Sequence, residues 1–241
     1  MSLRSSWSTA SRSVACVGFG ASLVLSAAVV GASGEGGASS SEVAAQTEVE
    51  TTGFLFKQIP VDAASGQTGA GHSVRMRGSA VALQGQEIRV GDSLRPAMLQ
   101  DVATTGVPIS ERSGRVRILS VVPALQTPTC EQQTHYLSEK SGDLSERVDL
   151  VTISLDTPEV QKQFAADAEI ENVTFLSDAA DAAFGRAHGL LIEQPHILAR
   201  AVLVVDADDV VRYLQVVPEV SHMPDMDAAF AVARRLVEAG G

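Results

Sequence analysis

Three residues in the middle of the chain have the types and the spacing for thiol chemistry. Pro123, Thr127 and Cys130 lie where an apolar run passes through a proline-rich turn into a predicted helix start. A cysteine in the first turn of a helix faces unpaired backbone N–H groups and the positive end of the helix dipole, which favour a thiolate. The hydroxyl of Thr127 can be aimed at whatever the sulfur attacks, and Pro128 stiffens the loop. The alternative is a structural cysteine, because free cysteine behaves as a small buried hydrophobe.

The spacing Pro-x-x-x-Thr-x-x-Cys of this loop resembles the active-site loop of the peroxiredoxins. The thiol peroxidase subfamily has Ser and Asp where this chain has Ala124 and Gln126. The resemblance therefore holds at the family-wide positions and fails at two subfamily positions. It implies that Cys130 is the peroxidatic cysteine and that Thr127 assists it.

Further matches to thiol peroxidases occur in the same order along the chain, and the resemblance spans about Ser73 to Val237. The matching segments are Ser154–Pro158, Ile197–Asp206 and Pro224–Ala229. The second of them implies that Arg200 lies beside the sulfur, where its guanidinium would favour the thiolate and hydrogen-bond the peroxide oxygens. The family likeness also places Pro123 and Thr129 in the substrate pocket. Without the resemblance, Arg200 would be interpreted as a surface residue at a strand edge.

One departure from the subfamily concerns the second cysteine of its reaction cycle. Thiol peroxidases carry a resolving cysteine in the helix after the second strand, and the aligned residue here is Ala165. The chain therefore resembles a one-cysteine variant, which reduces hydrogen peroxide or organic hydroperoxides and then requires a thioredoxin-like protein or a small thiol as external reductant. The chemistry needs neither a metal nor an organic cofactor. By analogy with relatives we also expect a homodimer.

A second function, from a different class, stays open at this point. A non-catalytic thioredoxin-like domain could bind a partner or sense oxidants through Cys130 without turning over. Ala124, Gln126 and Ala165 favour that interpretation, whereas Pro123, Thr127, Cys130 and Arg200 favour a peroxidase.

Composition excludes several other classes of function. The formal net charge of -11 and the isoelectric point near 4.8 argue against nucleic acid or an anionic membrane surface as the partner. Aromatic residues make up only 4% of the chain, so no stacking platform for single strands is expected. The histidines have no metal-ligand spacing, and capping or exposed roles are expected for them: His72, His135, His188, His196 and His222.

The amino-terminal residues 1–32 are typical of an export signal, with Arg4 and Arg12 before an apolar run. Cleavage would leave an exported protein, periplasmic or extracellular, whereas an uncleaved signal would tether it to the membrane. Cys16 lies in this segment, so the mature chain would hold one cysteine and no internal disulfide. Residues 33–72 are rich in Gly, Ser and Ala and are predicted to be a flexible linker, with Phe54 to Phe56 as an apolar exception. The domain is then expected to cover residues 73–241.

Hydrophobic patterning predicts an α/β domain. The segments flanking Gly78-Ser79 have the spacing of an amino-terminal β-hairpin. The predicted elements that follow alternate strands (115–122, 148–154, 173–176) with helices (128–140, 156–168, 178–188) and end in a hairpin (201–205, 210–216) and a helix (226–238). This order predicts a mixed central sheet flanked by helices. The family resemblance implies that this fold is thioredoxin-like.

Overall fold

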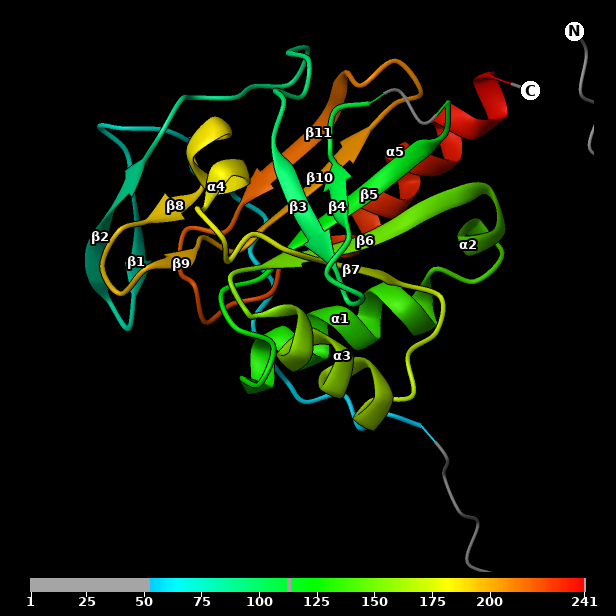
Figure 1. Ribbon diagram of the computed structural model, residues 1–241, viewed down its shortest axis with the longest axis horizontal. Helices are drawn as coiled ribbons and strands as arrows, with labels where there is room; N and C mark the ends of the chain where they lie inside the picture. The colour runs from blue at the N-terminus through cyan, green and yellow to red at the C-terminus, as the bar shows by residue number, and fades with distance from the viewer. Residues whose placement is uncertain (1–52, 112–113, 241) are drawn as a thin grey trace, which may run out of the picture. The chain divides into compact units, whose positions relative to one another are not determined.

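A computed structural model describes residues 53–111 and 114–240 of the chain (Figure 1). The predicted signal and residues 33–52 of the predicted linker lie outside the described residues. Residues 53–72, which the sequence predicts as the end of the linker, belong to the described part of the chain and bond to the domain. Asp62 N–H donates to Met223 O at 2.9 Å, and Gly66 N–H donates to Val216 O at 2.7 Å. The backbone of this segment thus finds its hydrogen-bond partners in the domain.

A mixed sheet forms the centre of the domain, as the sequence predicts, and it has seven strands. Its strand order is β11-β10-β5-β6-β7-β3-β4, and the three strands β5, β6 and β7 are mutually parallel. The strands are β3 (Met98–Asp101), β4 (Gly106–Pro108), β5 (Val116–Val121), β6 (Val148–Ser154), β7 (Thr174–Ser177), β10 (Ala201–Val205) and β11 (Val211–Val216). All six residues of β5 are buried because both faces of the sheet are covered.

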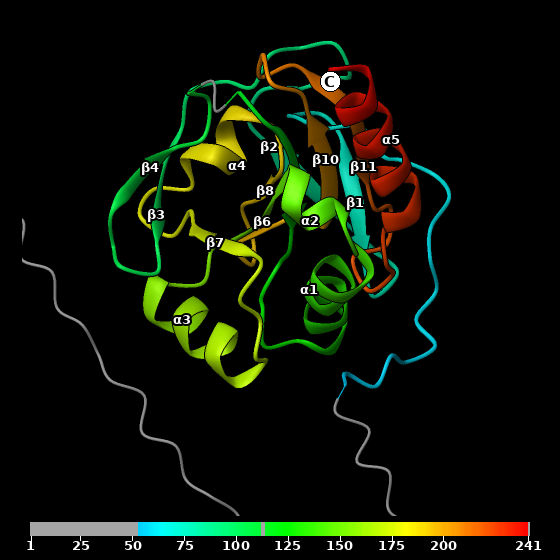
Figure 2. The same cartoon turned by 90° about the vertical axis from the view of Figure 1, so that its right-hand side faces the viewer.

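Helices cover one face of this sheet, and a smaller sheet with one short helix covers the other (Figures 1 and 2). The first face carries α1 (Pro128–Lys140), α2 (Leu144–Arg147), α3 (Pro158–Asp167) and α5 (Met226–Ala239). The second carries α4 (Ala183–Ala187) and the sheet β1-β2-β8-β9, made of β1 (Ser73–Met76), β2 (Ser79–Gln84), β8 (Leu191–Ile192) and β9 (Ile197–Leu198). None of the helices in the described part of the chain is long and apolar enough to span a membrane.

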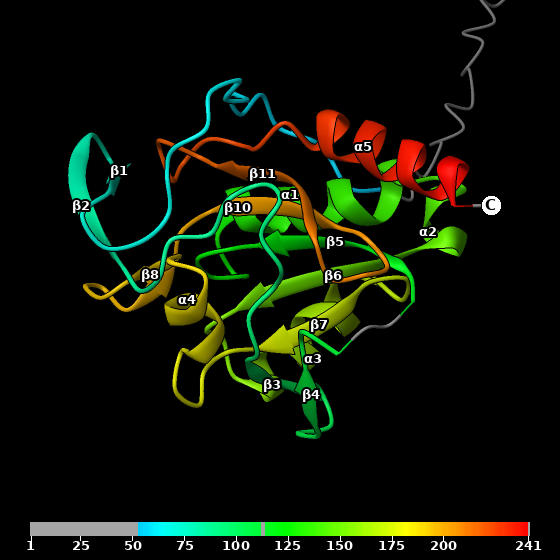
Figure 3. The same ribbon diagram turned by 90° about the horizontal axis from the view of Figure 1, so that it is seen from above.

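The predicted amino-terminal hairpin forms, with a turn shifted by one residue. Met76 pairs with Ser79, so the turn residues are Arg77 and Gly78 rather than Gly78 and Ser79. Both have positive φ, 51° for Arg77 and 81° for Gly78, the combination of the tight turn that matches strand twist. The hairpin lies beside β8, with which β2 pairs (Figure 3).

The helix predicted over residues 178–188 is shorter than expected. Ala182 has a positive φ of 53°, and α4 begins only at Ala183. The carboxylate of Asp178 accepts hydrogen bonds from the N–H groups of Phe184 and Gly185, both at 2.9 Å. Asp178, the predicted first residue of the helix, thus lies before α4. Its carboxylate satisfies the unpaired N–H groups in the first turn of the helix.

His188 ends α4, the capping position that the sequence suggests, and it is fully buried. Its Nδ1 lies 2.9 Å from Phe184 O, and its Nε2 accepts from the N–H of Arg95 at 3.0 Å. Only the neutral ring with the proton on Nδ1 satisfies both contacts. Burial is the main reason that the pKa of His188 is lowered to about 4.

We predict that His188 makes stability depend on pH. The unfolded chain takes up a proton near pH 6.5 and the folded chain only near pH 4, so this stabilisation is complete above pH 6.5 and is lost as the pH falls. The free energy of unfolding lost in this way approaches about 3 kcal/mol. Asp178 changes the stability with pH in the opposite direction, because burial raises its pKa to about 6. The measurement is therefore the difference in unfolding free energy between wild type and His188→Gln, which should shrink between pH 7 and pH 4. A constant difference would contradict the prediction.

Candidate active site

The loop that carries Cys130 is fixed between β5 and α1. Pro123 is buried two residues after the end of β5, and the N–H of Leu125 donates to the carboxylate of Asp156 at 2.9 Å. The N–H of Thr127 donates to Ala124 O at 3.2 Å, which closes the turn. These contacts hold the start of α1 at the carboxyl end of β5.

Cys130 lies in the first turn of α1, as predicted, and its side chain is fully buried. The first helical bond runs from the N–H of Glu131 to Thr127 O at 2.9 Å, and Pro128 has no N–H. The N–H groups of Thr129 and Cys130 therefore have no acceptor within the helix. They form the positive end of the α1 dipole next to the sulfur.

Arg200 reaches the sulfur from the residue before β10. Its Nη2 donates to Cys130 Sγ at 3.3 Å, its Nη1 to Gln133 Oε1 at 2.7 Å and its Nε to Val220 O at 2.8 Å. The side chain is only 2% exposed, and none of these three acceptors is a carboxylate. The sulfur is the one acceptor of the three that can carry a negative charge.

Gln133 is a residue of the site that sequence reasoning missed. It is fully buried, and besides accepting from Arg200 it donates through Nε2 to Ser120 Oγ at 2.8 Å. Its position three residues after Cys130 places both side chains on one face of α1. A polar residue at that spacing from a reactive cysteine was the available signal.

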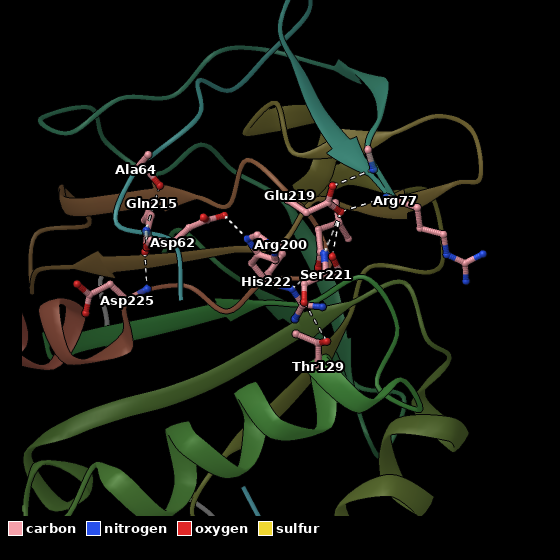
Figure 4. A network of polar contacts seen from close by, with 12 residues as sticks. Asp62, Ala64, Arg77, Thr129, Arg200, Gln215, Glu219, Ser221, His222 and Asp225 are labelled. Carbon is pink, nitrogen blue, oxygen red and sulfur yellow. Dashed lines mark hydrogen bonds and ion pairs between the residues drawn. The ribbon is translucent and has the colours of Figure 1, made fainter. Parts of the chain in front are cut away.

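The two threonines of the loop make contacts of different kinds. Thr127 is exposed, and its hydroxyl donates to Ala124 O at 2.9 Å, so the lone pairs of its oxygen are free to accept. Thr129 is half-buried and donates through Oγ1 to Ser221 O at 3.2 Å (Figure 4). Thr129 thereby connects α1 to the loop between β11 and α5.

Ala165, the position expected for a second thiol, lies half-buried in α3 among the residues that pack against the helical core. Cys130 is the free cysteine of the described residues. The site thus combines one thiol, one guanidinium and the free N–H groups of a helix start. Such a site has a nucleophile and, next to it, hydrogen-bond donors that can stabilise negative charge on a substrate oxygen.

Sequence comparisons relate the chain to enzymes of known class. The Redoxin family model matches residues 89–230. The thiol peroxidase of Halalkalibacterium halodurans is 36% identical over 162 residues, covering 67% of this chain and 97% of that relative. The thiol peroxidase of Staphylococcus aureus (strain MRSA252) is 36% identical over 163 residues, covering 68% of this chain and 98% of the relative.

Solved structures give the same relationship at the level of the fold. A peroxiredoxin-like protein from Aquifex aeolicus superposes with a TM-score of 0.64 at 32% identity, covering 68% of this chain and 96% of its own. The thiol peroxidase from Chromobacterium violaceum superposes with a TM-score of 0.61 at 20% identity, covering 70% and 96%. The likenesses confirm the predicted thioredoxin-like fold.

We predict that Gln133→Leu slows the reaction of Cys130 with hydrogen peroxide by about 10-fold, because a small displacement of a reacting group is costly. It leaves the buried Nη1 of Arg200 without its acceptor, so the unfolding free energy should also fall by about 1–3 kcal/mol. The rate is measured by stopped-flow mixing with peroxide.

Gln132→Leu is the matched control for this variant. Gln132 is the neighbouring buried glutamine of α1, and its amide bonds the backbone of Lys57 at 2.7 and 3.0 Å. This variant should lose similar stability and keep the oxidation rate within about 2-fold, since it does not contact Arg200. Equal rates for both variants would remove the role assigned to Gln133.

Proposed function

Since the chain belongs to the thiol peroxidases of the peroxiredoxin family, we propose that Cys130 is the cysteine that attacks the peroxide. The protein is a thiol-dependent peroxidase, an oxidoreductase. The observation that carries the assignment of Cys130 is the 3.3 Å contact between its Sγ and Nη2 of the buried Arg200. A guanidinium at that distance can stabilise negative charge on the sulfur and on the oxygens that approach it.

The proposed first half-reaction transfers a hydroxyl group from the peroxide to sulfur. The Cys130 thiolate attacks the terminal oxygen in line with the O–O bond, an S–O bond forms, and the O–O bond breaks. Cys130 becomes a sulfenic acid, and the remaining oxygen leaves with the electron pair and takes a proton to become water or an alcohol. Arg200 and the N–H of Cys130 would stabilise the charge on the leaving oxygen, and Thr127 would accept a hydrogen bond from the peroxide.

The proposed second half-reaction uses an external thiol. A first thiol condenses with the sulfenic acid to give a mixed disulfide and water, and a second thiol releases Cys130 by exchange. This requirement follows from Ala165, which offers no resolving thiol in α3. The reductant is a thioredoxin-like protein or a small thiol. The alternative of a non-catalytic domain is not favoured, given the 36% identity to thiol peroxidases along nearly their whole length.

We also propose that the protein is exported. The support is the sequence of residues 1–32, with its positive start and its short apolar run. In an oxidising compartment a chain with one thiol in its mature part has no internal disulfide partner, which suits a sulfur kept available for peroxide.

A homodimer is the proposed state of assembly, by analogy with relatives. Light scattering at micromolar concentration should give twice the mass of the chain. A monomer at that concentration would contradict this proposal and leave the chemistry at Cys130 unaffected.

The activity itself is tested with one equivalent of hydrogen peroxide or cumene hydroperoxide. We expect rapid consumption of peroxide, one oxygen added to Cys130 by intact mass, and many turnovers when dithiothreitol is present. Cys130→Ser should abolish all three, because its hydroxyl is not a nucleophile at neutral pH. Oxidation of Cys130 no faster than that of a free thiol would instead favour the non-catalytic interpretation.

A further inference from the structure

The loop between β11 and α5 holds a glutamate that binds the tip of the amino-terminal hairpin. The carboxylate of Glu219 accepts from the N–H of Arg77 at 3.1 Å and from the N–H of Gly78 at 3.0 Å (Figure 4). It also accepts from Ser221 Oγ at 3.1 Å, within its own loop. The side chain of Arg77 points away from these contacts in Figure 4, so the hairpin is recognised through its backbone.

The hairpin and this loop are also joined through their main chains. The N–H of Arg75 donates to Pro218 O at 2.7 Å, and the N–H of Val220 donates to Arg75 O at 2.8 Å. These bonds flank Glu219, which lies opposite Arg75 in a parallel bridge. Residues 218–220 are therefore held against β1 by a single parallel bridge and its two flanking hydrogen bonds.

The same loop contacts the catalytic residues proposed above. Val220 O accepts from Nε of Arg200 at 2.8 Å, and this bond helps to set the plane of the guanidinium. The orientation of that carbonyl depends on the main chain of residues 218–220, which the hairpin holds. Hydrogen bonds thus join the hairpin turn to Glu219, and the carbonyl of the next residue, Val220, to Arg200 and through it to the sulfur.

Given the proposed function, we infer that Glu219 is a positioning residue, which fixes the Val220 carbonyl and so aims Arg200 at Cys130. A carboxylate suits this position because its two oxygens bind the adjacent N–H groups of the turn at once. Partial burial alone would raise the pKa of Glu219, but hydrogen bonds from Gly78, Ser221 and Arg77 hold it below the ordinary value. The group is therefore charged at neutral pH.

The experiment compares Glu219→Ala, Glu219→Gln and Arg77→Gly in the full chain. The readout is the second-order rate constant for oxidation of Cys130 by hydrogen peroxide, with the melting temperature measured in parallel. We expect about a 10-fold loss for Glu219→Ala and about 3-fold for Glu219→Gln, which keeps one acceptor oxygen. Arg77→Gly keeps the N–H and suits the positive φ, so its rate should stay within about 2-fold of wild type.

A second arm separates positioning from a general loss of structure. Arg200→Lys lacks the Nε–H that binds Val220 O, so adding Glu219→Ala to it should lower the rate no further. A full additional 10-fold loss in that background, or an unchanged rate in Glu219→Ala alone, would overturn the inference. If Glu219→Ala does not fold, Glu219→Gln with and without Arg200→Lys gives the same comparison. Failure of wild type to react with peroxide would instead overturn the proposed function.

Discussion

The arrangement around Cys130 depends on one buried cation. Arg200 is almost completely enclosed, and its side chain donates to a backbone carbonyl, an amide oxygen and the sulfur. Burying a guanidinium is costly unless its donors are satisfied and its charge is compensated. Gln133 and Val220 supply the hydrogen bonds and leave the sulfur as the group that can compensate the charge. A cation that is costly to bury is thereby in direct contact with the residue to which we assign the chemistry.

The topology of the main sheet explains why residues so distant in sequence meet. β5 and β10 are antiparallel neighbours, and Val121 at the end of β5 pairs with Ala201 at the start of β10. The residue before β10 and the loop after β5 therefore lie at the same edge of the sheet. Arg200 is the residue before β10, and Cys130 lies in the first turn of α1, which follows the loop after β5. The antiparallel pairing brings the two functional groups together without a long loop.

Much of this could be predicted from the sequence, and the failures have physical reasons. The apolar run of β5 and the proline at the start of α1 predict the strand, the helix and the place of Cys130. Gln133 was missed, although its spacing from Cys130 was a signal, because a glutamine in a helix ordinarily faces water and here its partners come from β5 and Arg200. Residues 53–72 have a linker-like composition, yet they bond to residues far along the chain, which composition cannot reveal. The late start of α4 accompanies local bonds from the backbone of Phe184 and Gly185 to the side chain of Asp178, which compete with a longer helix.

If Ala165 stands where the resemblance places a resolving thiol, α3 has a different task in the proposed cycle. Gln161 is fully buried in this helix, and its Nε2 donates to Ser154 Oγ and Leu176 O, both at 3.0 Å. Opening the helix would break these bonds and expose the core beneath them. A chain with a thiol in α3 must move that thiol to the sulfenic acid, whereas the proposed cycle here never requires α3 to open. The proposed cycle instead requires an external thiol to reach the buried Cys130, and the loop before it has exposed residues at Gln126 and Thr127.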